Sequence, residues 1–297
     1  MIRKSLLLGS TVLLLAACGE TAEDPAEEPI GTDEDTTEEV TDESAEDSST
    51  DDDDVVIQVA SHLPPMTDIV EIAGDVIEDG YTVELVEVSD NIQYNEALLN
   101  GEVDASFAQH EPFMEMFNAE RDGNLVAIQP IYDAIVGFYS PVYDSIDDIE
   151  EGAEVAIPSD PTNEARALMI LADYDLITLA DGVGFEATVD DVEENPYEFT
   201  FTPIDLLNLS SAYQDGVELV FNLPTYIASV DLTPADAVFL EDDNDFTFAI
   251  QLVAREDNQD SDAIQALQAA FTSQEVYDFL EELAENGHLE PAFEVNN

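Results

Sequence analysis

From residue 55 onward, short runs rich in β-branched and aromatic residues alternate with stretches of helical periodicity. The predicted strands span 55–60, 82–88, 103–108, 154–157, 198–202 and 217–221. The predicted helices span 66–77, 92–100, 163–173, 261–271 and 273–286. Strands that alternate with helices in this way indicate an α/β fold with mainly parallel sheets.

The pattern repeats after residue 137, which predicts two similar lobes. In each set a helix-ending glycine, Gly101 or Gly216, precedes a strand and then a proline–aromatic corner. We expect lobe 1 to comprise 55–136 and 246–297, lobe 2 to comprise 137–245, and a ligand cleft to lie between them. The chain would then cross between the lobes twice, which is how hinges are built.

The N-terminus has the pattern of a bacterial lipoprotein signal. Arg3 and Lys4 form a positive start, 5–14 is apolar but too short to span a bilayer, and a small-residue cleavage site ends at Cys18. We expect cleavage after residue 17 and acylation, such as palmitoylation, of Cys18. Because this is the only cysteine, no disulfide can form within the chain.

Acidic residues dominate the composition. The precursor carries 71 Asp and Glu against 5 Lys and Arg, a net charge of −66. Residues 18–54 hold many of them and few large apolar side chains, which predicts an acidic disordered tether. The balance excludes nucleic acid and anionic lipid as binding partners, because both require clustered cations. It favours a solvated surface suited to high salt, a halophilic composition.

Arg166, one of the three Lys and Arg residues after Cys18, lies where a helix is predicted to begin. The sequence predicts a helix with Asn163 as its N-cap and Arg166 in its first turn, where the helix dipole disfavours a cation. A guanidinium beside free N–H groups would form a receptor for a carboxylate. The alternative is that Arg166 pairs with a nearby carboxylate such as Asp160.

Motifs of catalysis, metal binding and phosphate binding are missing from the sequence. His110-Glu-Pro-Phe-Met matches the zinc-protease pattern only in part, and we expect Pro112 to disrupt a helix there. Three histidines and one cysteine are a poor metal inventory, and the acidic runs 51–54 and 241–245 lack the spacing of a calcium loop. We therefore expect no metal and no cofactor.

Several strings occur in a distinctive order between residues 55 and 283. They include His62-Leu-Pro-Pro-Met, Gln109-His110-Glu-Pro-Phe, Asp160-Pro-Thr-Asn-Glu-Ala-Arg166 and Arg255-Glu-Asp-Asn258. Together they resemble the NlpA lipoprotein family, the methionine-binding lipoproteins of bacterial ABC importers. The resemblance implies a two-lobed periplasmic-binding-protein-like fold of type II, anchored at the extracytoplasmic face of the cell membrane. It also implies an amino-acid ligand, an ABC permease with its ATPase as partners, and no enzymatic activity.

The resemblance assigns roles to four residues. Arg166 matches the arginine that grips the ligand carboxylate, His110 and Phe107 match the side-chain pocket, and Asn222 matches the amino-group side. Each of the last three also has a structural interpretation: a hydrogen-bonded histidine, a core phenylalanine, and an asparagine that satisfies turn backbone.

The sequence departs from the family pattern at the ligand contacts. Asn91 stands where tyrosine is usual, Ala108 where an aromatic residue is usual, and Ile250 where asparagine is expected, with Gln251 as the nearest amide. The resemblance thus implies that recognition of the ligand carboxylate is retained, while the contacts to the ligand side chain and amino group are altered. Asn91 and Gln251 are the candidates for these altered contacts. Methionine is the leading ligand, and a different amino acid, a methionine derivative or a short peptide stays open.

Two other classes of function also stay open. A secreted enzyme can use the same scaffold, and a structural lipoprotein or adhesin would need no pocket. The observation that separates these classes is whether Arg166, His110 and Asn222 converge on one cavity between the lobes.

Overall fold

The computed structural model describes residues 54–242, 246–285, 287 and 289–295. The predicted signal sequence, Cys18 and the tether up to residue 53 therefore lie outside the described residues. None of the helices in the described part of the chain has the length and apolar character needed to cross a bilayer.

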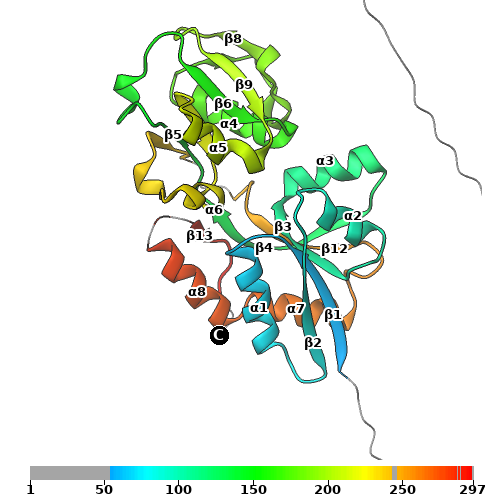
Figure 1. Cartoon of the computed structure of the whole chain (residues 1–297). Coiled ribbons are helices and arrows are strands. Elements are labelled where there is room, and N and C mark those ends of the chain that lie inside the picture. The colour runs from blue at the N-terminus through cyan, green and yellow to red at the C-terminus, as the bar shows by residue number, and fades with distance from the viewer. Residues whose placement is uncertain (1–53, 243–245, 286, 288, 296–297) are drawn as a thin grey trace, which may run out of the picture. The chain divides into compact units, whose positions relative to one another are not determined.

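The first sheet has six strands, with parallel pairing in one half and antiparallel pairing in the other (Figure 1). In spatial order it contains β13 (Leu289–Pro291), β4 (Leu125–Ala134), β12 (Ile250–Arg255), β3 (Ala105–His110), β1 (Val55–Ser61) and β2 (Tyr81–Glu87). β1 pairs with β2 and β3 in parallel, whereas β12 runs antiparallel to both β3 and β4. The returning segment near residue 250 thus joins the first sheet.

The second sheet has five strands and the same mixed character. In spatial order it contains β11 (Phe239–Leu240), β5 (Gly137–Tyr139), β10 (Leu219–Asn222), β6 (Glu154–Pro158) and β9 (Thr200–Ile204). β6 pairs with β9 and β10 in parallel, and β5 runs antiparallel to β10 and β11. A separate ribbon pairs β7 (Thr178–Leu179) with β8 (Val192–Glu194).

The sheets are therefore mixed, and the expectation of mainly parallel sheets needs correction. Every antiparallel pairing within the two sheets involves a strand that carries the chain between them. β4 leaves the first sheet and β12 returns to it, while β5 enters the second sheet and β11 leaves it. Neighbouring strands that carry the chain in opposite directions must be antiparallel. The lobe ranges given above stay a prediction. The described residues between the two sheets are 135–136 in the first crossing and 241–242 and 246–249 in the second.

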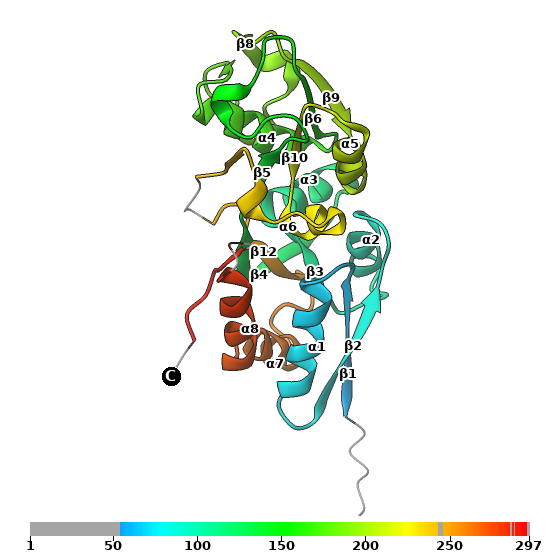
Figure 2. The same ribbon diagram turned by 60° about the vertical axis from the view of Figure 1, so that its left-hand side comes forward.

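Helices cover both sheets (Figures 1 and 2). Their bounds are α1 (Met66–Val76), α2 (Gln93–Leu99), α3 (Glu111–Arg121), α4 (Pro161–Asp173), α5 (Leu209–Asp215), α6 (Pro224–Ile227), α7 (Asp262–Phe271) and α8 (Gln274–Ala284). α1 packs against α7 and α8 on the first sheet, and α2 and α3 contact β3 and β4. α4 and α5 pack on β6 of the second sheet. Each sheet has its own buried hydrophobic cluster, so the described residues form a two-lobed α/β fold.

Three helices begin with a proline in the first turn, and each follows a strand. Pro112 lies in the first turn of α3, Pro161 begins α4 and Pro224 begins α6. Pro112 therefore helps to start a helix and does not disrupt one. The reason is that proline lacks only an N–H group that the first turn leaves unbonded in any case.

Helix α4 starts two residues before the predicted start. Asp160 is the N-cap: its Oδ1 accepts hydrogen bonds from the Asn163 backbone N and from Asn163 Nδ2, both at 3.0 Å. Arg166 consequently lies in the second turn, because an α-helix has 3.6 residues per turn. Carboxylate binding at Arg166 must then rest on the guanidinium and not on the helix N-terminus.

We expect Asp160→Ala to lower the free energy of unfolding by about 1 kcal/mol, because the cap and the Asn163 amide lose their acceptor. Asp160→Asn should cost much less, since asparagine is an equally good cap and burial already raises the pKa of Asp160. Denaturant unfolding in molar salt measures both variants. Equal destabilisation of the two would contradict the capping role.

Candidate ligand-binding site

A small cavity lies where elements of the first sheet face α4 and α6. Its lining residues are Met66, Asn91, Tyr94, Ala108, Gln109, His110, Phe113, Tyr132, Ala134, Asn163, Leu206, Leu223, Thr225, Tyr226 and Ile250. Its volume is about 40 Å³. A single water needs ~10–15 Å³ on this measure, so the walls of the cavity stand close together and leave room for a few waters.

Two side-chain hydrogen bonds join the walls of this cavity region. His62, which follows β1, has its Nε2 3.0 Å from the Tyr226 hydroxyl on α6. His110, the last residue of β3, has its Nε2 3.3 Å from Oδ1 of Asn163 on α4. Both bonds are buried and connect the two lobes, so they stabilise the close approach of the walls.

The contacts of His110 define its tautomer. Its Nδ1 accepts a hydrogen bond from the Phe113 backbone N at 3.2 Å, which makes His110 the N-cap of α3. The proton is therefore on Nε2, which donates to Asn163. Burial, together with the positive charge of Arg166, lowers the pKa of His110 to about 3. His110 is thus a neutral donor that lines the cavity.

Arg166 is one of the most deeply buried side chains, with 1% of its surface exposed. Its Nε donates to Glu241 Oε1 at 2.8 Å, and its Nη2 donates to Glu241 Oε2. Nη2 also donates to the Ala134 carbonyl at 3.1 Å. The Phe248 ring centroid lies 4.3 Å from Cζ of Arg166, a cation–π contact. The hydrogen-bonded carboxylate partner is therefore Glu241, and Asp160 serves as the helix cap. A second buried carboxylate, that of Asp133, lies 3.9 Å from Nη2 of Arg166.

Arg166 lies behind the wall of the cavity. His110 and Asn163 line the cavity, and Arg166 is within electrostatic range of His110 and one turn from Asn163 on α4. Phe248 contacts both side chains, because its ring covers the Arg166 guanidinium and its centroid lies 5.0 Å, edge-on, from that of His110. The structure thus brings Arg166 and His110 together around Phe248.

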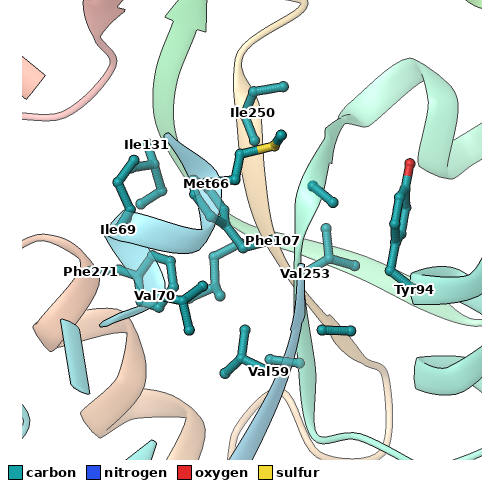
Figure 3. Close-up of a cluster of buried hydrophobic side chains, with 14 of the residues drawn as sticks. Val59, Met66, Ile69, Val70, Tyr94, Phe107, Ile131, Ile250, Val253 and Phe271 are labelled. Carbon is teal, nitrogen blue, oxygen red and sulfur yellow. The ribbon is translucent and has the colours of Figure 1, made fainter. Parts of the chain in front are cut away.

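Three other candidates lie beside the cavity and do not line it. Phe107 is fully buried in the first core, with its ring centroid 5.1 Å from that of Phe271 (Figure 3). Asn222 donates from Nδ2 to Ser210 Oγ at 3.2 Å and accepts from the Leu223 backbone N. These placements match the core interpretation of Phe107 and the turn interpretation of Asn222. Gln251 is buried within β12, next to the lining residue Ile250.

The residues that depart from the family pattern do line the cavity. Asn91, Ala108 and Ile250 are all part of its wall. Tyr94, in the first turn of α2, supplies an aromatic side chain on the same wall. Asn91 lies before the start of α2, so helix periodicity does not link these two residues, and sequence reasoning missed Tyr94.

Tyr132 and Tyr226 also line the cavity, and sequence reasoning missed both. Burial raises the pKa of Tyr94 and of Tyr226, so these side chains stay neutral hydroxyl donors and acceptors. Among the described residues, no group of three or more His, Cys, Asp or Glu is arranged to hold a metal ion. The site therefore offers aromatic walls, neutral polar groups and one buried cation.

The family comparison accounts for this arrangement. The sequence profile of the NlpA lipoproteins matches residues 57–293, most of the chain. The chain belongs to the NlpA lipoprotein family. Among curated NlpA relatives, the D-methionine-binding lipoprotein MetQ of Escherichia coli K12 is 36% identical over 214 residues. That match covers 71% of this chain and 79% of the relative.

Solved structures of similar proteins share the fold. A YaeC-family lipoprotein from Enterococcus faecalis is 47% identical, with a TM-score of 0.72, over 81% of this chain and 100% of that one. A nutrient-binding protein from Burkholderia cenocepacia, bound to methionine, is 29% identical with a TM-score of 0.76. The match covers 80% of this chain and 100% of the Burkholderia protein.

The buried histidine that joins the lobes should make stability depend on pH. Burial lowers the pKa of His62 to about 4, against 6.5 in the unfolded chain. The unfolded chain therefore binds a proton first as pH falls, and the folded state loses about 2 kcal/mol between pH 7.5 and pH 5 through this group. His62→Gln removes the titrating group but keeps a hydrogen-bonding side chain.

Unfolding free energies of wild type and His62→Gln, measured across this pH range in molar salt, test the effect. Taking the difference between the two proteins cancels the titration of the many carboxylates. We expect the wild type to lose more stability than the variant on acidification. Parallel curves for the two proteins would contradict the prediction.

Proposed function

We propose that this protein is the extracytoplasmic solute-binding lipoprotein of an ABC importer and that it binds methionine or a related amino acid. The carrying observation is the buried guanidinium of Arg166 beside a cavity whose walls come from both lobes. The relatives support the choice of ligand, because one is named for D-methionine and another is bound to methionine.

The proposed recognition divides between polar and apolar groups. Arg166 binds the ligand carboxylate, and the neutral Nε2–H of His110 and the amide of Asn163 lie beside it. Tyr94, Tyr226 and the other aromatic residues of the wall pack against the ligand side chain. Asn222, Gln251 and Phe107 support the wall from behind, and Asn91 contributes at its rim.

The volume of the cavity implies that binding needs the walls to separate. A cavity of about 40 Å³ is far smaller than the ~300–1,000 Å³ of typical ligand pockets. The two hydrogen bonds that join the lobes must therefore open for ligand to enter and can reform around it. Hinge motion at the two crossings between the sheets provides this opening.

The wall also bears on specificity. Ala108 is small where the family pattern has an aromatic residue, and Ile250 is apolar where that pattern has asparagine. Tyr94 keeps one aromatic side chain on the wall of the cavity. We propose that the site accepts side chains bulkier than methionine. A methionine derivative or a short peptide is the second candidate ligand, and an enzymatic role is not part of the proposal.

Anchoring completes the proposed function. Acylated Cys18 would hold the protein at the extracytoplasmic face of the cell membrane, and the acidic residues up to 54 would let the folded lobes reach a permease and its ATPase. The supporting observations are the lipoprotein signal pattern and the membership of a lipoprotein family.

Arg166→Lys tests the proposed function. Lysine keeps the positive charge that Glu241 requires but lacks the planar fork, so we expect methionine binding to weaken by about 1.5–3 kcal/mol. The matched control is Arg121→Lys, because Arg121 is half-exposed on α3 and pairs with Glu96 away from the cavity. Calorimetric titration in molar salt with D- and L-methionine and bulkier analogues measures the change.

The same titrations separate the candidate ligands. Mass spectrometry of ligand released from native protein identifies the class before titration begins. Wild-type protein that binds none of these amino acids, or that binds a peptide only, would contradict the leading proposal. Unchanged affinity in Arg166→Lys would remove Arg166 from the binding site.

A further inference from the structure

The orientation of the Arg166 guanidinium is fixed by protein contacts on one edge and one face. Glu241 accepts from Nε at 2.8 Å and also from Nη2, so the carboxylate lies along the Nε–Nη2 edge. The Ala134 carbonyl accepts from Nη2, and the Phe248 ring covers a face of the guanidinium. This side-on fork is the geometry in which a carboxylate restricts an arginine most.

The donor count shows which edge is left. A guanidinium has five N–H donors: one on Nε and two on each terminal nitrogen. The Nε hydrogen and the two Nη2 hydrogens are used by Glu241 and Ala134. Within the part of the chain that the structure describes, Nη1 makes no hydrogen bond to protein. A second carboxylate would therefore bind at Nη1.

Glu241 is itself held by the crossing between the lobes. It directly follows β11, and its backbone N donates to the Val136 carbonyl at 2.9 Å. Val136 lies between β4 and β5, in the other crossing. The carboxylate that orients Arg166 thus belongs to the segment where the two crossings are hydrogen-bonded to each other.

The charges of the site favour retention of this pair when a zwitterionic ligand binds. Arg166 and Glu241 are 1% and 9% exposed and form a neutral pair, and a second buried carboxylate, that of Asp133, lies 3.9 Å from Nη2. A zwitterion also carries no net charge, so binding does not require Glu241 to leave. If Glu241 left Arg166, its carboxylate would lose both hydrogen bonds of the fork while staying buried, which is costly.

We propose that Glu241 is a positioning residue, which holds Arg166 side-on and so presents Nη1 to the carboxylate of the ligand. The inference rests on the proposed function, because it takes an amino-acid carboxylate as the group that Arg166 binds. It predicts that Glu241 contributes to the preference for ligands with a carboxylate and not to the affinity for the ligand side chain.

The test compares L-methionine with L-methioninol, which replaces the carboxylate by a hydroxymethyl group and keeps the ammonium and side chain. Glu241→Gln should weaken methionine binding by about tenfold or more, because the charged fork is lost. The same variant should leave methioninol binding nearly unchanged. The matched control is Glu218→Gln, since Glu218 also accepts a hydrogen bond, from the Glu154 backbone N, but lies in the second lobe away from the cavity.

Each outcome has a distinct meaning. Tighter methionine binding in Glu241→Gln would show that Glu241 competes with the ligand, and would overturn the proposal. Equal weakening of both ligands, or of neither, would also overturn it. Should Glu241→Gln fail to fold, Glu241→Asp keeps the charge with a shorter reach, and it must still weaken methionine more than methioninol. A wild-type protein that binds neither ligand would overturn the proposed function itself.

Discussion

The buried ion pair between Arg166 and Glu241 is the constraint on which the rest of the site depends. A guanidinium that is 1% exposed cannot be left without partners, because an unpaired buried charge costs several kcal/mol. Its hydrogen-bond partners come from the end of β4 and from the segment after β11. One side chain therefore ties the second lobe to both crossings between the lobes.

The cavity depends on the same arrangement. His110 ends β3, caps α3 and donates to Asn163, which is held in turn by the Asp160 cap of α4. The helix that carries Arg166 and the strand that carries His110 are thus joined through one asparagine. In the proposed mechanism, opening of the lobes would break this contact and the one between His62 and Tyr226, while Arg166 would keep Glu241 as its partner. A rigid receptor within a hinged cleft is an efficient way to bind a small zwitterion.

Local features of this fold could be predicted from the sequence, and long-range pairings could not. Within the described residues, periodicity predicted five of the eight α-helices to within a few residues, because the pattern of buried positions is a local property. It predicted only six of the thirteen strands. The start of α4 was misplaced, since Asp160, Pro161 and Asn163 are all suited to a helix N-terminus and only the hydrogen bonds decide among them. The mixed sheets follow from the path of the chain between lobes. The partner of Arg166 is 75 residues away, one of 71 acids.

A crystal structure of the protein with saturating L-methionine in molar salt tests the central claim most directly. Our account predicts the ligand between the two lobes, with its carboxylate ~3 Å from Nη1 of Arg166. It also predicts that Glu241 still accepts from Nε. A methionine carboxylate bound elsewhere, or one that occupies the Nε–Nη2 edge with Glu241 displaced, would contradict the account.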